Sequence, residues 1–87
     1  MIIRKYFKQT CGPCKQLDPI LTKICEEKGI TLTAIDVDDL TTEQKQELKL
    51  KSVPTLHILK NEDEGSKTVV TVGFVTELAI RQIIDAL

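Results

Sequence analysis

The chain has 87 residues, a formal net charge of -1 and a hydrophobic fraction of 41%. This length predicts a single domain over residues 1–87, with enough apolar residues for one compact core. Neither sign of charge dominates, and Lys and Arg are scattered, so we expect no nucleic-acid and no membrane partner. No apolar stretch approaches the ~20 residues that cross a bilayer.

The N-terminus and the cysteines bear on the cellular compartment. Arg4 and Lys5 interrupt the first apolar run too early for a secretory signal, so we expect a cytoplasmic protein. Disulfide frameworks are rare in that compartment. Two of the three cysteines form a Cys-x-x-Cys pair, which in a cytoplasmic chain indicates a catalytic or a metal-binding role.

The first half of the chain predicts a strand, a helix and a second strand. Residues 2–7 are apolar and β-prone, which is typical of a short strand. Apolar residues recur at helical spacing after Cys14, and Gly29 is a suitable residue to end that helix. Residues 30–37 are apolar and rich in β-branched residues, which predicts the second strand.

The second half predicts a helix, two strands and a final helix. Thr41 and Gln44 have the spacing of a capping box, which predicts a short helix through Leu50. A Ser52-Val53-Pro54 turn precedes a strand over residues 55–60, a polar loop over 61–66 and a strand over 68–72 that Gly73 ends. The last helix, from about residue 76, has an apolar face formed by Ala79, Ile80, Ile83, Ile84 and Leu87.

The order of these elements, β-α-β-α-β-β-α, predicts an α/β fold. Strands separated by helices pair in parallel, whereas the terminal hairpin is antiparallel. We therefore expect a mixed four-stranded sheet with helices on both faces.

The sequence Cys11-Gly12-Pro13-Cys14 stands where the first strand gives way to the first helix. A helix N-terminus stabilises an anion, and the thiolate is the nucleophile in disulfide exchange. We therefore expect Cys11 to attack a substrate disulfide and Cys14 to resolve the mixed disulfide. Gly12 and Pro13 keep the connection tight, and proline suits a first helical position.

Other titratable residues have less specific interpretations. Lys15 either favours the thiolate or is a solvated residue of the first turn. Cys25 continues the apolar stripe roughly 16 Å along the helix from Cys14, too far for a shared metal or disulfide, which indicates a core cysteine. His57, about 10 Å from Pro54, is expected to be structural. Because zinc sites usually need four ligands, we expect no metal and no other cofactor.

Several motifs resemble the thioredoxin family over nearly the whole chain. The thioredoxin active site is similar to the segment Cys11-Gly12-Pro13-Cys14-Lys15 followed by Pro19. The family's cis-proline loop is similar to Ser52-Val53-Pro54-Thr55-Leu56. The glycine after the family's last strand corresponds to Gly73. The resemblance implies the thioredoxin-like fold, a low pKa at Cys11 and a cis Val53–Pro54 bond. It also implies supporting roles for Gly12, Pro13, Lys15, Val53 and Pro54, and substrate docking on Thr10, Val53, Gly73 and Phe74.

The chain departs from the thioredoxin pattern at three points. Thr10 replaces the usual Trp, and Lys5 stands where the family has a buried Asp. We also expect the chain to lack the extra N-terminal strand and helix of full-length thioredoxins. Strand alternation would allow Lys5 to face solvent. Lys8 and Thr10 resemble the Lys-x-Thr-Cys segment that precedes the active site in glutaredoxins. However, glutaredoxins usually have Pro-Tyr between the cysteines. They also have a Gly-Gly-x-x-Asp stretch, which is absent after Gly73.

The predicted function is that of a protein-disulfide reductase, an electron carrier in cell redox homeostasis. The resemblance implies an NADPH-dependent thioredoxin reductase and disulfide-containing proteins such as ribonucleotide reductase as partners. We expect the protein to be a monomer. The first alternative is a glutathione-dependent, glutaredoxin-like oxidoreductase, which includes a carrier of an iron–sulfur cluster. The second alternative is an interaction module that has kept the fold without the chemistry.

Overall fold

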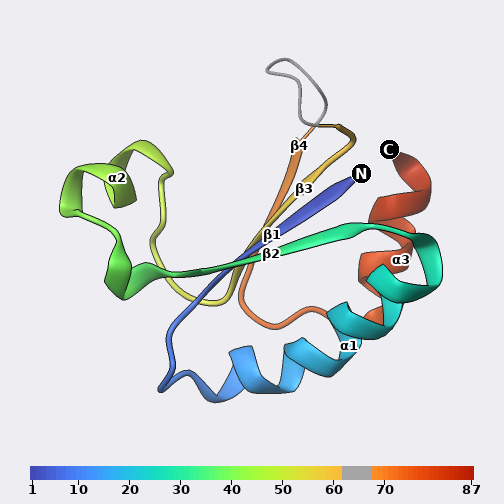
Figure 1. Cartoon of the computed structure of the whole chain (residues 1–87), viewed down its shortest axis with the longest axis horizontal. Helices are drawn as coiled ribbons and strands as arrows, with labels where there is room; N and C mark the ends of the chain where they lie inside the picture. The colour runs from blue at the N-terminus through green and yellow to red at the C-terminus, as the bar shows by residue number, and fades with distance from the viewer. Residues whose placement is uncertain (62–67) are drawn as a thin grey trace.

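The structure is a computed structural model that describes residues 1–61 and 68–87. Its elements follow the predicted order (Figure 1). They are β1 (Ile2–Phe7), α1 (Gly12–Lys28), β2 (Thr31–Asp36), a 3-10 turn η1 (Val37–Asp39), α2 (Thr42–Glu47), β3 (Thr55–Leu59), β4 (Thr68–Val72) and α3 (Glu77–Ala86). The predicted loop over residues 61–66 lies outside the described residues except for Asn61. No helix among the described residues is long and apolar enough to cross a membrane.

The strands form one four-stranded sheet in the order β2-β1-β3-β4. β1 pairs with β2 in parallel, and β3 pairs antiparallel with both β1 and β4. The parallel pair needs the crossover that α1 supplies, whereas the antiparallel pair of β3 and β4 is consecutive in sequence. The predicted mixed sheet is therefore confirmed.

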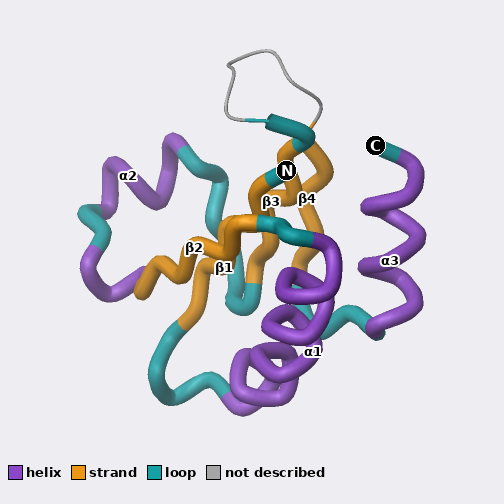
Figure 2. The backbone as a smooth tube through the Cα atoms, turned by 45° about the vertical axis from the view of Figure 1, so that its right-hand side comes forward, coloured by secondary structure: helices purple, strands orange, loops and turns teal. Residues whose placement is uncertain are grey.

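The hydrophobic core lies between the sheet and the pair α1 and α3. Figure 2 shows both helices on the same side of the strands. The core is made of aliphatic residues from the inner faces of these elements together with one cysteine: Ile3, Leu17, Leu21, Ile24, Cys25, Ile30, Leu56, Ile58, Ile80 and Ile84. In α1 these residues recur every three or four positions, so one stripe of the helix is buried, as the sequence spacing predicts.

Ion pairs join the outer surfaces of α1 and α3. The Arg81 guanidinium donates to Glu27 over 2.8 Å and to Glu77 over 3.1 Å. Its hydrogen bond to Glu77 lowers the pKa of that carboxyl group. The Arg81–Glu27 pair links α3 to α1, whereas the Arg81–Glu77 pair lies within α3. These side chains are exposed or half-buried, so both pairs contribute little to stability.

α2 lies apart from the other helices, on the opposite side of the sheet (Figures 1 and 2). It has the predicted capping box between Thr41 and Gln44, but it buries no side chain and ends at Glu47 rather than at Leu50. Lys49 has a φ of 56°, in the left-handed region, which cannot continue a right-handed helix. Helices therefore lie on both sides of the sheet, but only α1 and α3 contribute to the core, and Val70 and Val72 of β4 stay exposed.

Candidate active site

The two cysteines of the Cys-x-x-Cys pair lie at the start of α1. The amide of Cys11 donates to the carbonyl of Lys8 over 3.1 Å, which closes a tight turn after β1. Cys11 has extended backbone angles and caps the helix, and Cys14 lies in its first turn. A disulfide joins the two residues, whose Cα atoms are 5.2 Å apart, so the structure is that of the oxidised protein.

The helix N-terminus places a hydrogen-bond donor on the sulfur of Cys11. The backbone amide of Cys14 donates to Cys11 Sγ over 3.2 Å. A thiolate at Cys11 would accept this bond more strongly than a thiol and would also gain from the helix dipole. Of the two cysteines, Cys11 is half-buried and Cys14 is 2% exposed, so only Cys11 is open to a substrate.

The residues between and after the cysteines complete the first helical turn. Pro13 stands at the start of α1, where its missing N–H removes no helical bond. Gly12 and Lys15 are exposed. Pro19 lies inside the helix, and because it lacks an N–H it leaves the carbonyl of Lys15 without its usual donor.

A second loop precedes β3 and contains a cis peptide bond between Val53 and Pro54. Two hydrogen bonds hold this loop: Gly73 donates its amide to the Pro54 carbonyl over 2.8 Å, and the Thr55 hydroxyl donates to the Ser52 carbonyl over 2.6 Å. In the described part of the chain, the N–H and C=O of Val53 have no hydrogen-bond partner. An unpaired backbone of this kind can add a strand of a bound peptide.

Two further predicted docking residues lie on the surface. Thr10 is exposed in the loop before Cys11, and Phe74 is 46% exposed just after Gly73. A large aromatic side chain with that exposure is suited to contact with a partner.

The family model for Thioredoxin matches residues 1–86, which is nearly the whole chain. This protein belongs to the thioredoxin family. With its Cys-x-x-Cys pair it is a thiol–disulfide oxidoreductase, and the glutaredoxin-like alternative is not favoured.

Individual thioredoxins align along almost the full length of this family member. It is 28% identical to a thioredoxin of Bacillus subtilis over 98% of this chain and 80% of the relative, and 32% identical to one of Mycolicibacterium smegmatis over 99% and 78%. A crystal structure of chloroplastic thioredoxin z superimposes with a TM-score of 0.81 at 29% identity, over 98% of this chain and 75% of that chain. These similarities confirm the predicted fold and chemistry.

Lys5 stands at one of the positions where this chain departs from the thioredoxin pattern described above. The idea that strand alternation leaves it in solvent is wrong, because Lys5 is only 8% exposed. Its side chain lies on the face of β1 that α1 covers, and its ammonium forms an ion pair with Asp18 of that helix. Asp18 follows Cys14 by one helical turn, so the sequence already places a carboxylate on the active-site helix near the cysteines.

Cys25 and His57 have the structural roles that the sequence indicates. Cys25 is a free cysteine in the core, and burial raises the pKa of its thiol. His57 contacts the ring of Tyr6 at a centroid distance of 4.8 Å, and burial, followed by the nearby Arg4 charge, lowers its pKa. Among residues 1–61 and 68–87, no three His, Cys, Asp or Glu side chains gather as metal ligands.

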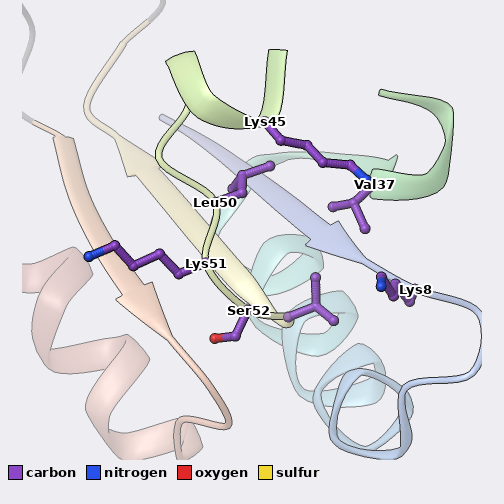
Figure 3. A pocket seen from close by; sticks show the side chains of 7 residues that line it. Lys8, Val37, Lys45, Leu50, Lys51 and Ser52 are labelled. Atoms are coloured by element: carbon purple, nitrogen blue, oxygen red, sulfur yellow. The ribbon is translucent and has the colours of Figure 1, made fainter. Parts of the chain in front are cut away.

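A cavity of about 180 Å³ lies beside the loop of Val53 (Figure 3). Residues from four segments line it: Lys8, Val37, Lys45, Leu50, Lys51, Ser52 and Val53. Sequence reasoning missed Val37, Lys45, Leu50 and Lys51 as neighbours of the site. The only available signal was the repeated lysine over residues 45–51, which by itself indicates a solvated segment.

Proposed function

We propose that Cys11 is the nucleophile and Cys14 the resolving cysteine of a protein-disulfide reductase. The Cys11 thiolate attacks one sulfur of a substrate disulfide; a Cys11–substrate bond forms, and the other substrate sulfur leaves and takes up a proton. Cys14 then loses its proton and attacks Cys11 Sγ. The Cys11–Cys14 disulfide forms, the bond between Cys11 and the substrate breaks, and the second substrate sulfur leaves and takes up a proton. Two electrons and two protons pass to the substrate.

The observation that carries these roles is the difference in environment between the two sulfurs. Cys11 is open to solvent on one side and accepts a hydrogen bond from the Cys14 amide, whereas Cys14 is buried. A substrate sulfur can therefore reach Cys11 but not Cys14. The buried thiol is protected until the mixed disulfide brings a target sulfur next to it.

The substrate segment is proposed to bind in extended form across the loop of Val53. The free N–H and C=O of Val53 supply the pairing, Gly73 holds the loop through Pro54, and Phe74 and Thr10 extend the contact surface. Gly12, Pro13 and Lys15 support the turn that presents Cys11. This arrangement needs no metal and no other cofactor in the protein.

Single cysteine variants test the assigned roles. Cys14→Ser is expected to accumulate a covalent complex with a disulfide-bearing protein such as insulin, visible as an added mass that dithiothreitol removes. Cys11→Ser is expected to form none. The roles would be reversed if Cys11→Ser formed the complex and Cys14→Ser did not.

We further propose that an NADPH-dependent thioredoxin reductase regenerates the dithiol, and that the protein works as a monomer in the cytoplasm. NADPH consumption with insulin as acceptor tests the reductant in two arms, one with thioredoxin reductase and one with glutathione plus glutathione reductase. Turnover only in the first arm is expected. Turnover only in the second arm would replace the reductase with glutathione and assign Lys8 a glutathione-binding role.

A further inference from the structure

The cavity beside Val53 connects the loop of the nucleophile with the loop that receives substrate. Lys8 lines one side of it, and the carbonyl of Lys8 binds the amide of Cys11. Ser52 and Val53 line the other side, next to the unpaired backbone of Val53. A substrate segment that pairs with Val53 while its cysteine reacts at Cys11 therefore passes over this cavity.

The charge of the cavity is positive. Figure 3 shows the Lys45 side chain extended along the cavity toward Val37, with Lys8 beyond Val37 at the end of β1, whereas Lys51 points away. Val37, Leu50 and Val53 supply the apolar part of the lining, and none of the lining residues that the structure describes is acidic. Within the described residues, neither Lys8 nor Lys45 has a carboxylate partner, so both ammoniums are available to a ligand.

We propose that this cavity is a specificity subsite that receives a carboxylate side chain next to the reacting cysteine of a protein substrate. The inference rests on the proposed role of Cys11. Lys8 and Lys45 pair with the carboxylate, and Val37 and Leu50 contact its methylene groups. An acidic segment therefore reacts faster than a neutral or basic one, because complementary charge favours the encounter and holds the segment at Val53.

The size of the cavity favours a single side chain as its occupant. At about 180 Å³ it is smaller than the ~300–1,000 Å³ of pockets that enclose whole small ligands. An Asp or Glu side chain can enter such a space while the rest of the segment stays on the surface. A carboxylate of glutathione would have the same chemistry, so the experiment must separate the two sources.

The test measures single-turnover rate constants of the protein after its reduction with dithiothreitol, so that no reductase is needed. Three peptide disulfides differ only in the residues flanking the reacting cysteine, which are Glu, Gln or Lys. We expect the Glu peptide to react about fivefold faster than the Gln peptide, and the Lys peptide to react more slowly than both. This preference is expected to disappear in 0.5 M salt, at which exposed charges are screened within about 4 Å.

Variants locate the preference in the cavity. Lys45→Gln keeps a good helix former in α2 and is expected to lower the Glu-to-Gln rate ratio to about twofold, and Lys8→Gln/Lys45→Gln to about one. Lys60→Gln removes the same charge from an exposed site after β3 and is the matched control, expected to keep the wild-type ratio. Ratios within one variant cancel any change in the reactivity of Cys11 itself.

Three outcomes would overturn the proposal. The first is equal rates for the three peptides in the wild type, and the second is a Glu preference that survives in Lys8→Gln/Lys45→Gln. In the third, glutathione disulfide reacts as fast as the Glu peptide, and its rate constant falls in Lys45→Gln and in Lys8→Gln/Lys45→Gln. That result would assign the cavity to glutathione. A wrong assignment of Cys11 as the nucleophile would give a separate result, because the Cys11→Ser variant would then still reduce all three peptides.

Discussion

Lys5 of β1 and Asp18 of α1 form an ion pair at the interface between the sheet and the active-site helix. The Lys5 side chain is 10% exposed and the Asp18 side chain 47% exposed, so the cation is the more buried partner. The Lys5 ammonium also lies 5.1 Å from the centroid of the Phe7 ring. One charged pair therefore ties the first strand to the helix that carries both reactive cysteines.

The burial of Lys5 predicts an asymmetric response to removing either charge. Asp18→Asn leaves the ammonium of Lys5 buried without a counter-charge, which we expect to cost about 2 kcal/mol, between the values for exposed and buried pairs. Lys5→Met removes the buried charge and fills the space with apolar atoms, so we expect a stability within about 1 kcal/mol of the wild type or above it. Urea unfolding of the oxidised proteins measures both values.

Glu77→Gln is the matched control for Asp18→Asn, because Glu77 pairs with Lys23 and Arg81 at the exposed surface. Its effect is expected to stay well below that of Asp18→Asn. Equal losses in Asp18→Asn and Lys5→Met would show that the pair itself, and not the burial of Lys5, determines the stability.

The half-buried ring of His57 predicts a decline of stability in mild acid. Burial and the Arg4 charge lower the pKa of His57 in the folded protein below its value near 6.5 in the unfolded chain. The unfolded state then binds the proton more readily, so the free energy of unfolding falls as the pH drops from about 6.5 toward the folded pKa. Denaturant midpoints at pH 7.5 and 5.5 measure this loss. His57→Gln is expected to show a smaller loss, and an identical pH dependence in both proteins would contradict the assignment.

Cys25 is expected to be unreactive in the native protein. The oxidised form has one free thiol among its cysteines, and that thiol is buried in the core with a raised pKa. Alkylation therefore needs an opening of the fold, and we expect a rate at least about 100-fold below that of a small-peptide thiol at pH 8. Mass spectrometry of the modified protein gives the rate. A fast reaction that is insensitive to added urea would mean that Cys25 is accessible without opening.

We expect Gly73 to be required because of its left-handed backbone conformation, and not because a larger side chain would clash with its neighbours. Its φ is +84°, and an added Cβ would meet nothing within 4 Å, so Gly73→Ala is destabilised only through backbone strain of about 1–2 kcal/mol. Gly12→Ala is the matched control, since it also has free space but lies in α1 without a positive φ, and we expect a change near zero or a slight gain. A similar loss in both variants, measured by thermal unfolding, would contradict this explanation.

Local sequence signals determined most of the fold and the reactive centre. The capping box at Thr41, the left-handed Gly29 after α1 and the limits of β1 and β4 are all as the residues predict, because each depends on near neighbours in the chain. The Cys11–Cys14 pair is likewise local, since its function depends on one turn of helix. The predicted end of α2 was wrong because the left-handed Lys49 has no signal of its own.

Only the tertiary structure decided which distant side chains meet. Alternation along one strand shows that Lys5 and Ile3 share a face, but which face α1 covers follows from the packing of the whole core. The ion pair of Lys5 with Asp18 joins segments far apart in the chain, and so does the cavity that Lys8, Lys45 and Val53 line together. Contacts of this kind depend on how the elements pack together, so they became visible only in the folded protein.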